Sequence, residues 1–168
     1  EGYGYFLYET FRRITENITG IAAMGIVLDS LVEVSDRVKQ MTSLRDSLEK
    51  QILEKISGVT ITAVQGKRIS NTSSLVIENV DGETLLMSLD LKGFSVSTGA
   101  ACSSGNPEPS PVLLAMGLTR DEAQSSLRVS VGWSTTQEQV DSFVECLVAV
   151  VAKLRELNEK EKSGEYAL

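Results

Sequence analysis

A single cysteine in a segment of small and polar residues offers the clearest chemistry in the chain. Cys102 lies within STGAACSSG at residues 97–105, flanked by Gly99 and Gly105 as hinges. A lone cysteine is more often a small buried hydrophobe, but no apolar neighbours surround this one. A nearby helix N-terminus or a cation would favour its nucleophilic thiolate. The pattern favours a reactive thiol on a mobile loop over a structural one.

Arg128 and Cys146 are two further candidates, and their sequence surroundings lead to different interpretations. Arg128 interrupts the apolar run LRVSV at residues 127–131. It is either an outward-facing arginine on a half-exposed sheet or a guanidinium that binds a carboxylate in bidentate fashion, and the residues leave both open. Cys146 lies on an otherwise apolar helical stretch, which indicates a packing role.

The composition excludes several classes of protein. The chain has 168 residues, two cysteines, no histidine and a net charge of −7. Two cysteines cannot form a disulfide framework, and the lack of histidine excludes histidine-activated nucleophiles within the chain. The acidic balance argues against a nucleic-acid partner. No apolar run is as long as a membrane span and no secretory signal opens the sequence, so we expect no membrane partner and a cytoplasmic location.

Periodicity predicts an α+β fold, a small, mostly antiparallel four-stranded sheet with helices packed on one face. Gly58 is expected to end the first helical stretch, Thr119 with Glu122 to form a capping box, and Thr135 or Thr136 to cap the last helix. The expected helices cover residues 17–57 (with a bend at 34–36), 83–91, 110–116, a segment from Thr119, and a last one to about Leu157. The expected strands cover residues 59–64, 74–79, 94–97 and 127–131.

We divide the chain into three parts. Residues 1–13 are an aromatic N-terminal segment of unclear role, residues 14–157 form the domain, and residues 158–168 are a charged tail. The segment 1–13 suits docking on a hydrophobic surface or at a subunit interface.

The domain resembles the C-terminal region of cysteine desulfurases of the NifS/IscS type, pyridoxal-phosphate enzymes of aminotransferase class V. The family pattern is a Ser-Gly-x-Ala-Cys-x-Ser loop, then Glu-Pro-Ser, Gly-Leu and Ser-[Ile/Leu]-Arg-x-Ser-x-Gly, with Arg-Arg-x-Gly-Thr-Glu-Asn upstream. The matching stretches here are residues 98–104, 108–110, 116–118 and 126–132, and residues 12–17 match the upstream segment with its glycine lost. The fixed order of the first four stretches within residues 98–132, about 35 residues, is highly specific.

The resemblance implies a mechanism and a fold like the small C-terminal domain of fold-type I enzymes. Cys102 would attack the sulfur of L-cysteine, become a persulfide and pass sulfur to an acceptor or Fe–S scaffold protein. Arg128 would bind the substrate carboxylate, and Thr15 would reach the cofactor phosphate of the other subunit in a homodimer.

The departures from the family pattern limit this role. The family's cofactor lysine follows a histidine, and this chain has no histidine. We therefore expect the chain alone to bind no pyridoxal phosphate covalently and to be inactive without a large domain. The alternatives are a cofactor-free sulfur carrier or interaction module, or an α+β domain whose cysteine is incidental.

Overall fold

The computed structural model describes residues 17–30, 34–99 and 109–163. The chain divides into two units, residues 1–37 and residues 38–168. The smaller unit contains α2 (Ile18–Ser30), and α3 (Val34–Lys55) begins in it. The predicted helical stretch 17–57 is thus two helices, with residues 31–33 outside the described part.

Helix α2 has an unusually apolar exposed surface. Its large side chains are between 55% and 74% exposed: Ile18, Ile21, Met24, Ile26, Val27 and Leu28. Among the described helices none is long and apolar enough alone to cross a membrane, although the bent pair Ile18–Asp29 and Val34–Lys55 together satisfies a length and composition test.

The larger unit is built on a three-stranded antiparallel sheet with the order β1-β2-β3. The strands are β1 (Val59–Ile61), β2 (Thr72–Ile77) and β3 (Ser126–Ser130). Gly58 precedes β1 with φ +66°, a left-handed conformation that glycine adopts without steric cost. The helix itself ends earlier than predicted, at Lys55, so Gly58 turns the chain into β1 after the helix end. β1 stops short of the predicted Val64 because Ala63 turns the chain with φ +59°.

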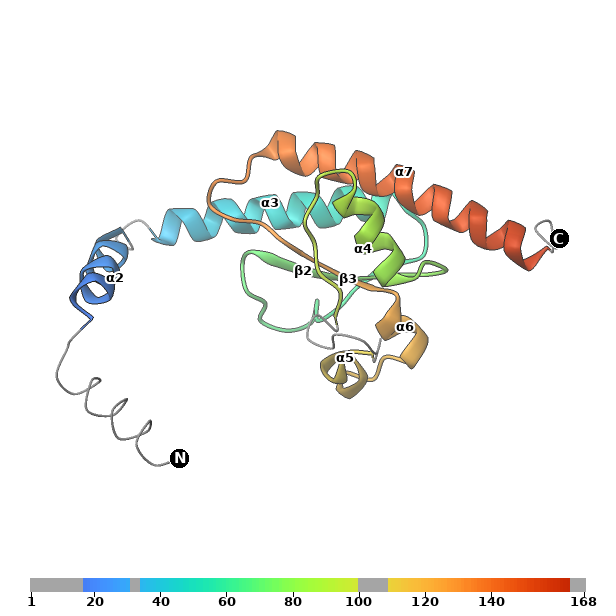
Figure 1. Cartoon of the computed structure of the whole chain (residues 1–168), viewed down its shortest axis with the longest axis horizontal. Coiled ribbons are helices and arrows are strands. Elements are labelled where there is room, and N and C mark those ends of the chain that lie inside the picture. Colours follow the sequence, from blue (N-terminus) through green and yellow to red (C-terminus); the bar gives the residue numbers. More distant parts are fainter. Residues whose placement is uncertain (1–16, 31–33, 100–108, 164–168) are drawn as a thin grey trace, which may run out of the picture. The chain divides into compact units, whose positions relative to one another are not determined.

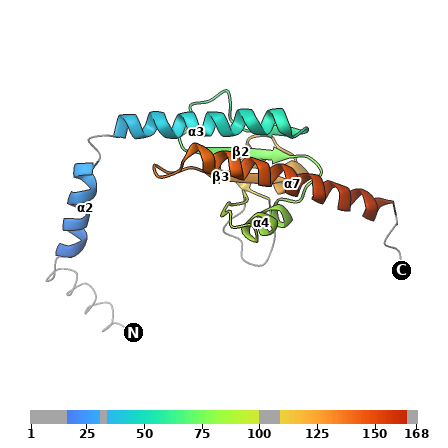
Figure 2. The same ribbon diagram turned by 90° about the horizontal axis from the view of Figure 1, so that it is seen from above.

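The main core lies on one face of the sheet, against α3, α4 (Gly82–Asp90) and α7 (Gln137–Lys162). Figures 1 and 2 both show α3 and α7 side by side along the sheet. Two side-chain hydrogen bonds join these helices, from Gln51 Nε2 to Asp141 Oδ1 at 2.7 Å and from Gln137 Nε2 to Ser47 Oγ at 3.0 Å. The fully buried core includes Leu48, Ile52, Leu75, Ile77, Leu85, Leu89, Leu127, Val144 and Leu147.

Two short helices cover one end of the other face. These are α5 (Pro111–Ala115) and α6 (Arg120–Gln124). Val76 and Ser126 alternate with the core residues of their strands and face away from the main core, yet both are buried, as are Leu113 and Ala123. The prediction of helices on one face therefore holds for α3, α4 and α7 but not for α5 and α6.

The predicted fourth strand is wrong for most of residues 94–97. Only the isolated bridge between Ser97 and Arg128 forms. Phe94 N donates to Leu89 O at the end of α4, and its ring packs edge-on against Phe143 with centroids 5.4 Å apart. Because one end of the segment is held by α4 and the other by β3, pairing with β3 does not extend beyond Ser97.

Helix α7 continues past its predicted end at Leu157 to Lys162. Arg155 donates to the backbone oxygens of Glu78 and Ser57, and Lys160 pairs with Glu156 at 2.6 Å. These contacts stabilise a polar helix end in which the sequence shows no apolar periodicity.

Candidate active site

Of the three predicted site residues, only Arg128 lies in the described part of the chain. Cys102 and Thr15 fall outside the described residues. The site is therefore built from Arg128 and from the residues at which segment 100–108 begins and ends.

Arg128 lies in the middle of β3, an edge strand, on the polar face of the sheet. Its neighbours in β3, Leu127 and Val129, point into the core, so the alternation of a strand places Arg128 on the opposite face, where it is exposed. Ser74 is its cross-strand partner on β2. Arg128 thus faces outward, as one of the two interpretations of the sequence expected. This position leaves its guanidinium accessible to an anion.

One hydroxyl group contacts the guanidinium, and two others lie on the same face of the sheet. Arg128 Nη2 donates to Ser97 Oγ at 3.3 Å, and the Thr72 and Ser130 hydroxyls on the same face are 3.3 Å apart. Among the described residues no carboxylate forms an ion pair with Arg128. Most of its five N–H donors are therefore available for the bidentate geometry that carboxylate and phosphate groups favour.

The two ends of segment 100–108 converge on the strand that carries Arg128. A Cβ atom built on Gly99 would lie 2.8 Å from Ser126 Oγ and 3.1 Å from Ser110 Cβ. Only a residue without a side chain fits so closely. Pro109 and Ser110 are buried at the other end. Both ends of the Cys102 segment thus lie beside β3, close to Arg128 in sequence.

Ser126 lies at this junction, against Gly99, and was not singled out from the sequence. It is 1% exposed, and its Oγ donates to Ala123 O at 2.7 Å. Ser97 was also missed, since its contact with Arg128 depends on which strands are neighbours. The sequence offered one signal of this contact: the predicted strands 94–97 and 127–131 could have been paired with each other.

The residues on this face do not fit a covalently held pyridoxal phosphate. That cofactor needs a lysine amine, and the described face around Arg128 carries Thr72, Ser74 and Ser130 but no lysine. The lysines of α3 and α7 lie on other surfaces, as Lys50, which pairs with Glu54, illustrates. No cluster of metal-ligating side chains occurs among the described residues.

Comparison with known proteins identifies relatives of this architecture. The family model for aminotransferase class-V matches residues 6–143. A cysteine desulfurase from Trichormus azollae is 37% identical over 145 residues, 86% of this chain and 36% of that protein. The cysteine desulfurase IscS from Dictyoglomus turgidum is 34% identical over 86% of this chain and 37% of its own length.

A solved structure shares the fold. The NifS-like protein from Rickettsia africae ESF-5 superimposes with a TM-score of 0.71 at 29% identity, covering 82% of this chain and 36% of that one. The chain thus spans little more than a third of the length of these relatives. The match over residues 6–143 shows that the chain belongs to the class-V aminotransferase family, among relatives that are cysteine desulfurases.

Proposed function

We propose that this chain is the C-terminal part of a cysteine desulfurase, in which Cys102 takes sulfur from L-cysteine as a persulfide and passes it to an acceptor protein for Fe–S cluster or other sulfur biosynthesis. The observation that carries the proposal is the convergence on β3 of Arg128 and both ends of the Cys102 segment. The partners would be a homodimer mate or a separate large domain, in the cytoplasm.

Arg128 supplies the substrate anchor. The α-carboxylate of L-cysteine suits a planar guanidinium, which forms two parallel charge-assisted hydrogen bonds to it. Ser97 Oγ fixes one edge of the guanidinium at 3.3 Å, so the remaining donors keep a constant direction. A carboxylate held there lies on the polar face, away from the core.

Chain length keeps the nucleophile near this anchor. Cys102 follows Gly99 by three residues, so its Cα can lie at most about 10–11 Å from that of Gly99. Because Gly99 packs on Ser126, this radius includes the region above Arg128. One strand would therefore hold both the substrate anchor and the attachment of the nucleophile.

The proposed transfer exchanges one bond for another. The Cys102 thiolate forms an S–S bond to the substrate sulfur as the C–S bond breaks. The electron pair of that bond goes to the β-carbon, which takes up the proton released by the substrate thiol and leaves as alanine. An electron sink for the carbon is what pyridoxal phosphate supplies in complete enzymes, with Thr15 proposed to contact its phosphate in the other subunit. The described residues of this chain do not provide that sink.

A second function, a cofactor-free sulfur carrier, is motivated by the lack of histidine in the sequence and of a lysine among the described residues of the Arg128 face. In this case Cys102 would receive sulfur from a separate donor and release it to an acceptor. Both functions need the same persulfide.

The experiment that tests the shared step follows sulfur onto a named thiol. The chain is incubated with L-cysteine and a catalytic amount of a complete desulfurase, then alkylated and analysed by mass spectrometry. We expect one added sulfur atom on the peptide containing Cys102, lost in C102S and kept in the matched control C146S. Equal labelling of Cys102 and Cys146, or labelling of neither, would contradict the proposal.

A further inference from the structure

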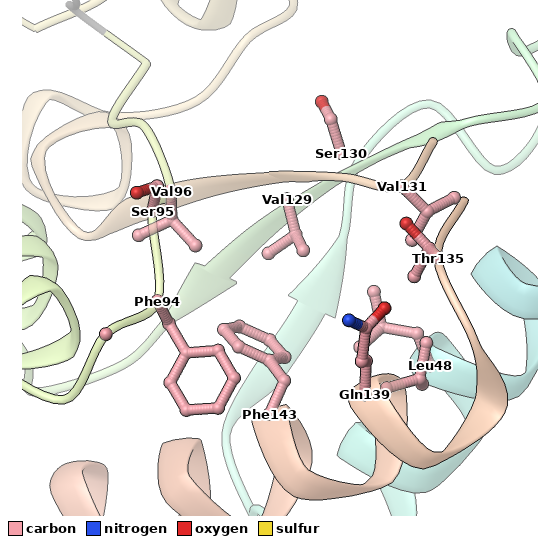
Figure 3. Close-up of a pocket in the computed structure, with 12 residues that line it drawn as sticks. Leu48, Phe94, Ser95, Val96, Val129, Ser130, Val131, Thr135, Gln139 and Phe143 are labelled. Atoms are coloured by element: carbon pink, nitrogen blue, oxygen red, sulfur yellow. The ribbon is translucent and has the colours of Figure 1, made fainter. Parts of the chain in front are cut away.

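A half-open cavity lies on the core side of the sheet, away from the Arg128 face. It has a volume of about 240 Å³ between β3, the segment from Gly93 to Val96 and the start of α7 (Figure 3). Apolar cavities of about 150 Å³ bind a benzene ring, so this one has room for a single aromatic side chain. No substrate anchor of the proposed desulfurase faces it.

The floor of the cavity suits a ring. Phe94 and Phe143 meet edge to face, with an interplanar angle of 72°, and Figure 3 shows them beside Val129 and Leu48. A third ring can join such a pair with the offset or edge-on geometry that aromatic groups favour. None of the described residues that line the cavity is charged, so the cavity suits a neutral occupant rather than a cysteine zwitterion or a phosphate.

One wall of the cavity is an open sheet edge. Arg128 exchanges both backbone hydrogen bonds with Ser97, and in an antiparallel ladder the residue two positions on points its N–H and C=O to the same side. That residue is Ser130, which would face Ser95, but the bridge at Ser97 is isolated. The backbone groups of Ser130 are therefore directed into the space beside the cavity, available to an extended segment.

A side-chain hydrogen-bond donor, the amide of Gln139, lies at the opening of the cavity. Gln139 Oε1 accepts from Thr136 N at 3.0 Å in the capping box of α7. This fixes the amide so that its nitrogen is turned toward the cavity (Figure 3). The mouth thus combines an amide donor with the open backbone edge, which matches the peptide groups on either side of an amino-acid side chain.

We propose that this cavity binds one aromatic side chain of a partner protein, presented on an uncharged extended segment whose backbone pairs with Ser130. Ring size, neutrality and an adjacent peptide edge together define this occupant. The proposal concerns binding alone and does not depend on the proposed desulfurase function.

The test uses the whole chain and a defined probe. The ¹⁵N-labelled protein is titrated with N-acetyl-L-phenylalanine N-methylamide and, as the matched probe without a ring, N-acetyl-L-alanine N-methylamide. We expect saturable shifts at the amides of Ser95, Ser130 and Gln139, with the ring-free probe about tenfold weaker because it loses the buried ring. Absence of saturable shifts, or equal affinity for both probes, would overturn the proposal.

Two pairs of variants localise the binding. V96F fills the cavity and should abolish binding, whereas V64F, the same change at a valine 56% exposed in another loop, should not. Q139E keeps the acceptor for the helix cap but removes the amide donor, and should weaken binding about fivefold, against Q65E as the charge control. If V96F does not fold, the comparison of probe binding between Q139E and Q65E tests the proposal by itself.

Unchanged binding in Q139E, or in a folded V96F, would place the probe elsewhere and contradict the assignment. Sedimentation separates a second copy of this chain from a partner protein as the occupant. Self-association that V96F abolishes and V64F leaves intact would assign the cavity to a homodimer and overturn the proposal.

Discussion

Ser97 and Arg128 are joined through both backbone and side chain. Ser97 N donates to Arg128 O at 3.1 Å, Arg128 N donates to Ser97 O, and Arg128 Nη2 donates to Ser97 Oγ at 3.3 Å. Two residues farther along, Gly99 packs on Ser126. The contact therefore couples the start of the Cys102 segment to the guanidinium that we propose binds the substrate carboxylate.

The first prediction tests whether this single bridge is structurally important. S97P removes the backbone donor of the bridge and should cost about 1–3 kcal/mol of unfolding free energy. S95P is the matched control, because the exposed Ser95 lies outside the bridge, and should cost about 0.5 kcal/mol or less. Urea unfolding measures both. Equal losses would show that the bridge adds no stability.

The second prediction concerns a buried hydroxyl. Ser73 Oγ is buried without a hydrogen-bond partner among the described residues, whereas Ser126 Oγ donates to Ala123 O at 2.7 Å. Removing an unsatisfied polar group is neutral or favourable, while removing a partner costs free energy. We expect S73A to change stability by about 0 to +1 kcal/mol and S126A to lower it by about 1–2 kcal/mol. A larger loss in S73A than in S126A would contradict this assignment.

The third prediction concerns a bidentate ion pair that attaches the loop after β1 to α3. Arg68 Nη1 and Nη2 donate to Glu49 Oε1 and Oε2 at 2.6 and 3.0 Å. The hydrogen bond from Arg68 to Glu49 is the main reason that the Arg68 pKa is raised. Because Glu49 is nearly buried while Arg68 is 19% exposed, E49A or R68A should each cost about 1–3 kcal/mol.

A double-mutant cycle isolates this pair. The loss in the double variant E49A/R68A should be smaller than the sum of the single losses, by about 1 kcal/mol or more. Additive losses would show that the pair does not interact in solution.

Much of this fold was predictable because local chemistry decides it. The Thr119–Glu122 capping box forms as expected, with Thr119 N donating to Glu122 Oε2 at 2.7 Å, and Thr136 caps α7. These contacts join residues three apart, which a sequence displays directly. Gly58 likewise requires only its own backbone freedom.

The secondary-structure predictions fail where contacts between residues distant in the sequence compete with the pairing that the local pattern predicts. Phe94 alternates as a strand residue should, but its contacts with Leu89 and Phe143 outweigh pairing with β3. Near the end of α7, Arg155 and Asn158 donate to carbonyl groups of Ser57, Glu78 and Asn79, contacts that periodicity does not reveal. The role of Ser97 at the site was hidden for the same reason.

The fourth prediction follows from the capping box. Hydrogen bonds from the Thr119 backbone and then its hydroxyl lower the Glu122 pKa below its ordinary value of 4.5. A carboxyl whose pKa is lower in the folded state stabilises fully above the unfolded pKa, and this contribution is lost as the pH falls through the folded pKa. The stability of E122Q should therefore fall less steeply below pH 4.5 than that of the unsubstituted chain.

Urea unfolding across this pH range measures the difference, with E145Q, at an exposed glutamate of α7, as the control. Identical pH dependence in E122Q and the unsubstituted chain would mean that the cap does not hold the charged carboxylate. Glu138, Asp141 and Glu156 also have lowered pKa values, so part of the slope should remain in E122Q.

The most direct test of the proposed function is a chimera. The amino-terminal two thirds of the Trichormus azollae cysteine desulfurase is joined to residues 14–168 of this chain, and alanine release from L-cysteine is measured. We predict turnover that C102S abolishes and that R128K weakens through a KM at least about tenfold higher, with R120K unchanged. A chimera that folds and binds pyridoxal phosphate but releases no alanine, or one that stays active with C102S, would contradict the account.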